Sequence, residues 1–146
     1  MNAVFSLVEQ LVALGRPTIV GLQSLLGVTL SPVNDANQYW SLYEAHQSSG
    51  LVASVDFREP RSGASKHEPL LVVTLRGAPV RLQDLSHKYG SGRITDMSHH
   101  HPSFVGYTYV VHARKVAFTI DSKSERVVGF SIDYSIAPSG GNKPGP

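Results

Sequence analysis

The feature of this sequence that most constrains its fold is a change in the spacing of its apolar residues. Between residues 3 and 26 they recur at intervals of three and four, whereas from residue 39 onward many recur at every second position. A helix repeats about every 3.6 residues and a strand about every two, so the two patterns belong to different elements. The sequence therefore predicts an α+β domain that begins with helices.

Glycine and proline delimit the two helices at the start of the chain. The first is predicted over residues 3–14 and ends at Gly15. The second is expected to begin with Pro17 as its first helical residue and to end before Gly27. Proline is common at the first helical position and glycine just after the last, so both ends follow the usual asymmetry. The chain is expected to open with a helical pair.

Alternating residues predict strands in the rest of the chain, apart from a short helix within residues 80–89. "QSSG" and "SKSER" are expected as hairpin loops, and the apolar run "LLVVTLRG" as a central strand. The predicted fold is a helical pair packed on one face of a mostly antiparallel sheet of five to six strands, with the short helix inserted between strands. The predicted strands are residues 39–46, 51–59, 70–77, 104–112, 116–121 and 127–134.

Alternation also predicts that the two faces of this sheet differ. One face should carry large apolar residues and pack on the helices, while the other stays polar and open, as antiparallel sheets permit. The residues expected on the packed face are Val116, Phe118, Ile120, Val128, Phe130, Ile132 and Tyr134. Those expected on the open face are Ser54, Asp56, Arg58, Thr119, Asp121, Ser131 and Asp133.

Length and composition favour one domain over residues 1–136, followed by a flexible Pro/Gly-rich tail over residues 137–146. The chain has no cysteine, which excludes disulfides, thiolate nucleophiles and thiolate zinc sites. Glu9 and Gln10 interrupt the apolar start, so it does not resemble a signal peptide, and no segment is long enough to cross a membrane. We therefore expect a cytoplasmic protein that does not enter membranes.

A moderately basic middle region raises the alternative of a nucleic-acid-binding module. Residues 56–93 contain seven bases and four acids, although the net charge of the chain is only +2. Nucleic-acid binders usually gather their bases into one stripe, whereas these are spread over several elements. Nucleic acid is therefore the less favoured partner. The bases are Arg58, Arg61, Lys66, Arg76, Arg81, Lys88 and Arg93.

Three consecutive histidines, His99, His100 and His101, are the most conspicuous candidate site. If this segment is extended, His99 and His101 share a side and His100 points away. A zinc site needs three or four converging ligands, and neither an HExxH motif nor a carboxylate at a recognised spacing is present. We expect no metal and no cofactor, and we interpret residues 94–103 as a contact loop.

An enzymatic alternative uses the same segment. His99 or His101 would act as a base with Asp133 or Asp56 as its partner, in a small-ligand-binding or hydrolytic domain. It requires the histidines to converge on a concave pocket. No complete nucleophile motif supports it, because "VVGFSID" lacks the second glycine of G-x-S-x-G.

The order of elements resembles that of small bacterial immunity proteins, which neutralise antagonistic toxins such as those of type VI secretion. The resemblance lies in layout, in the segments "PTIVGLQSLLG", "VRLQDLSHKYG" and "RVVGFSIDYS", and it spans about residues 3–135. The layout is also similar to β-lactamase-inhibitor-type modules and to outer-membrane-assembly lipoproteins, but a lipobox cysteine is absent. The resemblance implies a non-enzymatic protein that binds a cognate toxin domain and blocks its active site.

The leading hypothesis is therefore a binding protein that uses the open sheet face and the 94–103 loop to contact a protein partner. A mixture of imidazole, guanidinium, phenol and carboxylate groups suits a polar interface. A homodimer is kept as an alternative. The predicted contact residues are His99, His100, His101, Asp56, Arg58, Asp121, Asp133, Tyr107 and Tyr109.

Overall fold

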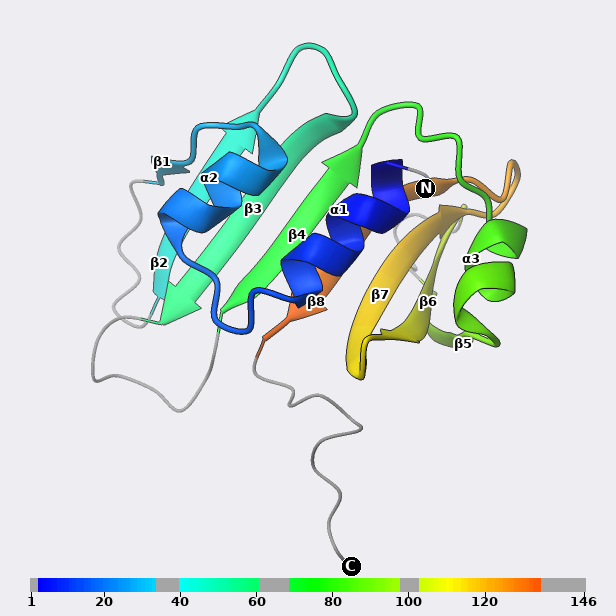
Figure 1. Ribbon diagram of the computed structural model, residues 1–146. Coiled ribbons are helices and arrows are strands. Elements are labelled where there is room, and N and C mark those ends of the chain that lie inside the picture. Colours follow the sequence, from blue (N-terminus) through cyan, green and yellow to red (C-terminus); the bar gives the residue numbers. More distant parts are fainter. Residues whose placement is uncertain (1–2, 34–39, 61–68, 98–102, 135–146) are drawn as a thin grey trace, which may run out of the picture.

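The structure is a computed structural model that describes residues 3–33, 40–60, 69–97 and 103–134. In these ranges the chain forms three helices and a single antiparallel sheet of eight strands (Figure 1). The helices are α1 (Ala3–Val12), α2 (Ile19–Leu26) and α3 (Leu82–Tyr89). The strands are β1 (Ser31–Pro32), β2 (Trp40–His46), β3 (Val52–Pro60), β4 (Leu70–Leu75), β5 (Arg93–Met97), β6 (Phe104–Val111), β7 (Arg114–Asp121) and β8 (Val127–Asp133).

The strand order, β1-β2-β3-β4-β8-β7-β6-β5, divides the sheet into two meanders. Each meander runs from an edge strand to the middle, where β4 pairs with β8 and Val72 lies opposite Ser131. The prediction of an α+β fold with an antiparallel sheet is confirmed, and "LLVVTLRG" does form a central strand. The prediction of five to six strands is wrong, because it omits both edge strands.

The two missed strands are those whose sequences carry the weakest strand signal. β1 has two residues, one of them Pro32, which cannot donate to a ladder, so only its pairing with Tyr43 and Glu44 makes it a strand. β5 covers the residues Arg93–Met97, which the sequence assigned to a loop from Ile94 onward. It is too short to show alternation, and a register shift between Ile94 and Asp96 interrupts it.

Local chemistry fixes the ends of α2. The Thr18 hydroxyl accepts a hydrogen bond from the amide of Gly21 at 3.0 Å, so Thr18 is the N-cap and Pro17 precedes the helix. The sequence placed Pro17 inside the helix, one of the small errors that helix ends commonly produce. Gly27 has φ of 68° and ends the helix as predicted.

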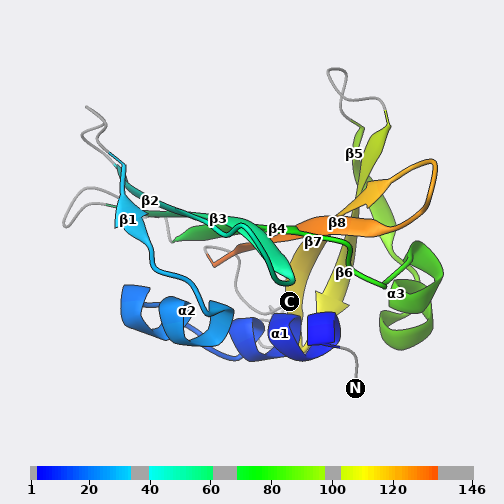
Figure 2. The same cartoon turned by 90° about the horizontal axis from the view of Figure 1, so that it is seen from above.

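Helices α1 and α2 lie on one side of the sheet, which Figure 2 shows nearly edge-on, and α2 lies over β2 and β3 in Figure 1. The residues between these layers form one buried cluster that includes Val8, Leu22, Phe57 and Phe118. The Tyr134 hydroxyl, just after β8, donates to the carbonyl of Leu11 at 2.8 Å and so ties the C-terminal turn of α1 to the sheet. Each large side chain buried here stabilises the fold by about 1.5–3 kcal/mol.

A bulge changes which residue of β8 enters this core. The register shifts between Thr119 and Ile120, so that Ile120 pairs with Val127. Val127 is therefore buried, whereas Val128, which strict alternation placed on the packed face, is half-buried. The other six residues predicted for the packed face are buried as expected.

No described helix covers the other side of the sheet, which we call the open face. In Figure 2 the β5–β6 hairpin rises on this side and stands beside the floor that β4, β8 and β7 form. The fold thus presents a sheet surface bounded at one end by the β5–β6 hairpin.

Candidate functional site

Pairing places one continuous row of side chains across the open face. Neighbouring strands lie about 4.8 Å apart, so a row over seven strands spans roughly 29 Å. In order from β2 to β5, the row contains Glu44, Asp56, Val72, Ser131, Ala117, Thr108 and Arg93. The acids stand toward the β2 end and the base stands at the β5 end, so this row is electrically polarised.

A second row on the same face lies two residues along each strand. Leu42 pairs with Arg58, Arg58 with Leu70, and Leu70 with Asp133. Beyond Asp133 the next strand brings Lys115, which pairs with Val110 on β6. In this row Leu70 separates Arg58 from Asp133, whereas Asp133 and Lys115 are neighbours, so the open face combines apolar and charged side chains along its length.

Curvature hollows this face into two grooves. The β5–β8 groove has a volume of about 520 Å³ and is lined by Ser91, Arg93, Thr108, Val110, Lys115, Ala117, Ser131 and Asp133. The β1–β4 groove has a volume of about 350 Å³ and is lined by residues of the first meander, among them Leu42, Glu44, Asp56, Arg58 and Val72. Both are open troughs on the sheet surface.

The two grooves differ in the state of their charges. In the β5–β8 groove, Arg93 and Lys115 are exposed, and neither makes an ion pair within the described part of the chain. In the β1–β4 groove, Glu44 and Asp56 lie directly opposite each other on neighbouring strands. The Arg58 guanidinium stands 5.5 Å from the centre of the Trp40 ring, a cation–π distance.

Four of the predicted contact residues lie on the open face, three of them in its grooves. Asp56 and Arg58 line the β1–β4 groove, and Asp133 lines the β5–β8 groove. Asp121 is on the same face but at the end of β7, where its carboxylate accepts a hydrogen bond from the amide of Lys123 at 3.0 Å. Asp121 therefore shapes the β7–β8 turn.

The structure places Tyr107 and Tyr109 on the helix side of the sheet. Tyr107 packs against the core, and Tyr109 is buried and within 2.8 Å of the Ser86 hydroxyl. The alternation of β6 accounts for this placement, because its open-face residues are Thr108 and Val110. His99, His100 and His101 lie outside the described residues.

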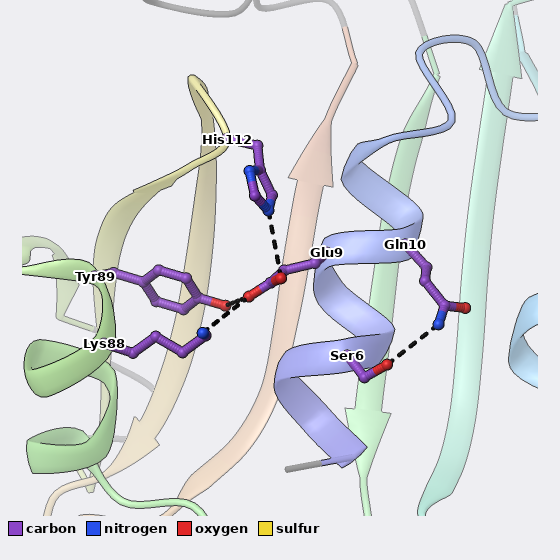
Figure 3. A network of polar contacts seen from close by, with 6 residues as sticks. All are labelled: Ser6, Glu9, Gln10, Lys88, Tyr89 and His112. Atoms are coloured by element: carbon purple, nitrogen blue, oxygen red, sulfur yellow. Dashed lines mark hydrogen bonds and ion pairs between the residues drawn. The ribbon is translucent and has the colours of Figure 1, made fainter. Parts of the chain in front are cut away.

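Sequence reasoning missed a polar cluster where α1, α3 and the β6–β7 turn meet (Figure 3). The Glu9 carboxylate accepts a hydrogen bond from the Tyr89 hydroxyl at 2.9 Å and lies 3.5 Å from the Lys88 ammonium and 3.3 Å from His112 Nε2. Burial raises the pKa of Glu9, but the hydrogen bonds from Tyr89 and His112 and the charge of Lys88 outweigh it and lower that pKa. Burial, followed by the bond to Glu9, raises the pKa of Tyr89. In its charged form, the Glu9 carboxylate therefore links α1, on which it lies, to α3 and to the β6–β7 turn.

The basic residues of the middle region do not gather into one stripe in the described structure. Arg76 donates to the carbonyl oxygens of the β2–β3 loop, Arg81 precedes α3, and Lys88 pairs with Glu9. Among the described bases of this region, only Arg58 and Arg93 reach the open face, at opposite ends of it, and Arg61 and Lys66 lie outside the described residues. This dispersal disfavours the nucleic-acid alternative.

Among the described residues, no group of three or more His, Asp or Glu side chains is arranged so that it could hold a metal ion. His112 bonds to Glu9 on the helix side, and His87 is on α3 with Asp84 and Lys88. In the described ranges, no helix has both the length and the apolar character needed to span a membrane.

Comparison with protein-family models, with curated proteins and with solved structures found no match to this chain.

Proposed function

We propose that this chain is a non-enzymatic binding protein that neutralises a cognate bacterial toxin in the cytoplasm by holding the toxin domain against the open face. The observation that supports it best is the open face itself, which is hollowed, amphipathic and charged at both ends. Its second row places Leu42, Leu70 and Val110 among charged groups, and specific protein interfaces combine apolar and polar area in this way.

The dimensions of the open face also suit a protein partner. A width of roughly 29 Å and strands about 20 Å long give a flat area of roughly 580 Å², about three quarters of the roughly 800 Å² that each partner contributes to a standard interface. The wall formed by the β5–β6 hairpin makes this face concave at one end (Figure 2), so a rounded element such as a helix or loop would fit against it. A second copy of this chain would present the same concave surface, which fits less well.

A small-ligand-binding or hydrolytic domain is the second candidate function. The observation that favours it is the β5–β8 groove, whose volume of about 520 Å³ lies in the range of small-molecule sites and which holds Ser131 and Asp133. It is an open trough, whereas such sites usually bury most of their ligand. The protein-binding function is therefore preferred.

The test compares two valine-to-arginine variants of a tagged protein. Val110 is 47% exposed on the open face and Val20 is 75% exposed on α2, away from that face. In extracts of the source cell with toxin expression induced, the parent protein and Val20→Arg should each recover one partner in stoichiometric amount, and Val110→Arg should not. Circular dichroism should show the same fold for all three.

The captured partner must also behave as a toxin. Its expression alone should stop cell growth, and co-expression with this chain, but not with Val110→Arg, should restore growth. Recovery of no partner, or equal recovery by Val110→Arg, would overturn the proposal. Turnover of a small-molecule substrate by the purified chain would favour the second candidate.

A further inference from the structure

We infer that the β5–β8 groove receives an acidic segment of the protein partner, with Arg93 and Lys115 as the groups that bind its carboxylates. The inference rests on the proposed function, because it takes the occupant of the open face to be a protein. It adds the chemistry of the contacting segment and the end of the sheet where that segment lies.

The register of three strands sets the distance between the two bases. Arg93 on β5 pairs with Thr108, and Lys115 on β7 pairs with Val110, so the bases stand on opposite sides of β6. Two strand spacings across the sheet and two residues along it put their Cα atoms about 12 Å apart. Both side chains are long, so both can reach carboxylates of one segment that lies over β6.

The remaining lining of the groove suits a peptide that carries such carboxylates. The hydroxyls of Ser91 and Ser131 can donate to carboxylate or backbone oxygens, and Val110 offers an apolar surface to the aliphatic parts of side chains. An arginine guanidinium can bind a carboxylate through two parallel hydrogen bonds. Neither base makes an ion pair within the described residues.

The acids of the open face restrict the acidic segment to this groove. Glu44 and Asp56 would repel carboxylates from the β1–β4 groove, and Asp133 would repel them from the inner border of the β5–β8 groove. The acidic segment is thereby held over β5, β6 and β7. A partner that is acidic at one end of its contact surface would bind in one orientation only.

Two synthetic dodecapeptides, one alternating Glu and Ser and the other alternating Lys and Ser, serve as probes of this groove. In NMR titrations of the full-length ¹⁵N-labelled chain, the Glu–Ser peptide should shift the amide signals of Arg93, Thr108 and Lys115, and the shifts should weaken as salt is added. The Lys–Ser peptide should leave these signals in place. No shift by the Glu–Ser peptide at low salt would overturn the inference.

Charge-reversal variants supply the specificity of the test. Arg93→Glu and Lys115→Glu should each weaken binding of the Glu–Ser peptide about tenfold, which corresponds to roughly 1.4 kcal/mol. Lys123→Glu makes the same change in net charge in the exposed β7–β8 turn and should have little effect. Asp133→Asn should strengthen binding, since it removes the repelling charge.

The outcomes separate this inference from the proposed function. If Lys123→Glu weakens peptide binding as much as Lys115→Glu does, the effect is general electrostatics and the groove is not the site. A single-stranded oligonucleotide that shifts the same amides more strongly than the peptide would assign the groove to phosphates instead. If Arg93→Glu and Lys115→Glu still capture the protein partner while Val110→Arg does not, the proposal that the open face binds a protein is supported. The inference that an acidic segment binds the β5–β8 groove is then wrong.

Discussion

The half of the sheet formed by β1–β4 and the half formed by β5–β8 each follow a helix and run as a four-strand meander, but they join their helices in different ways. In the first half, α2 contributes the buried residues Leu22 and Leu26 to the core. In the second half, α3 buries Leu85, packs Leu82 and the Tyr89 ring against the core, and is also attached through Ser86 and the polar cluster around Glu9. Apolar contacts tolerate a change of pH, whereas the part of the attachment of α3 that Glu9 supplies depends on a charged carboxylate.

The open face shows a second difference between the halves. The two halves meet at a seam, the pairing of β4 with β8, where Val72 lies opposite Ser131. Asp56 pairs with Val72 on one side of this seam and Ala117 pairs with Ser131 on the other, so Asp56 and Ala117 occupy corresponding positions. By the same correspondence Glu44 matches Thr108. Two positions thus account for most of the electrical asymmetry between the grooves.

The largest expected effect tests whether the two halves unfold as one unit. Phe57 in the first half and Phe118 in the second are 1% and 0% exposed. Each change to alanine should lower the free energy of unfolding by about 3–5 kcal/mol, because it leaves a cavity in a shared core. Denaturant unfolding followed by circular dichroism should show one transition, shifted to a similar extent by Phe57→Ala and Phe118→Ala.

A matched control for these variants is Phe104→Ala, since Phe104 is 37% exposed at the start of β6. It should cost under about 1 kcal/mol. Two separate transitions in either core variant would show that the meanders are independent units that merely share a seam.

The next largest loss of stability is expected at the pairing of β4 with β8, where the two halves of the sheet meet. Gly129 on β8 pairs with Thr74 on β4, and a Cβ atom added to it would lie 2.7 Å from the carbonyl oxygen of Val73. This backbone is in the middle of the sheet and cannot move away easily, so Gly129→Ala should destabilise the protein by about 1–3 kcal/mol. Thermal unfolding would measure the loss. Ser131→Ala, on the same strand and face, should change the melting temperature little, and an equal loss in both would contradict the steric argument.

A smaller change in stability is expected when Glu9, which attaches α3, is neutralised, and it should exceed the change from neutralising an exposed ion pair in the first half. Glu9→Gln should cost about 1 kcal/mol near neutral pH, because it removes the charge that Lys88 and the Tyr89 hydroxyl stabilise. The folded-state pKa of Glu9 is lowered from its ordinary value of 4.5, so this stabilisation is complete above that pH and is lost as the pH falls through the folded-state pKa. The stability difference between the parent and Glu9→Gln should therefore shrink on acidification.

The control for Glu9 is Glu44, which lies 3.3 Å from His46 on β2, with side-chain exposures of 42% and 72%. Glu44→Gln should change stability by less than about 0.5 kcal/mol, since exposed pairs contribute little. Chemical denaturation at a series of pH values measures both variants. A Glu9→Gln cost that stays constant down to the most acidic pH tested would show that the charge is not what holds the cluster together.

Periodicity predicted the parts of the fold that local sequence determines. The two faces of β7, the central position of β4 and the stop of α2 at Gly27 all follow from spacing and from glycine chemistry. β1 could not be predicted in this way, because two residues carry no period. The burial of Val127 depends on a bulge, which no alternation pattern reveals.

The site was predictable only where it follows strand alternation. Asp56, Arg58 and Asp133 were placed on the open face by that rule alone. Arg93 and Lys115 come together because β5 and β7 flank β6, which required knowledge of the strand order. The contacts of Glu9 with Tyr89 and His112 span 80 and 103 residues, and no local pattern reports such distances.

The smallest expected effect concerns the β6–β7 turn, which holds His112 in the polar cluster. His112 and Ala113 have φ values of 48° and 67°, so the hairpin uses a turn that normally requires Asn-Gly or a similar pair. An alanine in this region is strained, and Ala113→Gly should raise the free energy of unfolding by about 0.5–1 kcal/mol. Ala45→Gly, in the middle of β2 in the other half, should lower it instead. Thermal unfolding of both variants would test this prediction. A loss of stability in Ala113→Gly would mean that the alanine side chain stabilises the turn and that its backbone strain does not dominate.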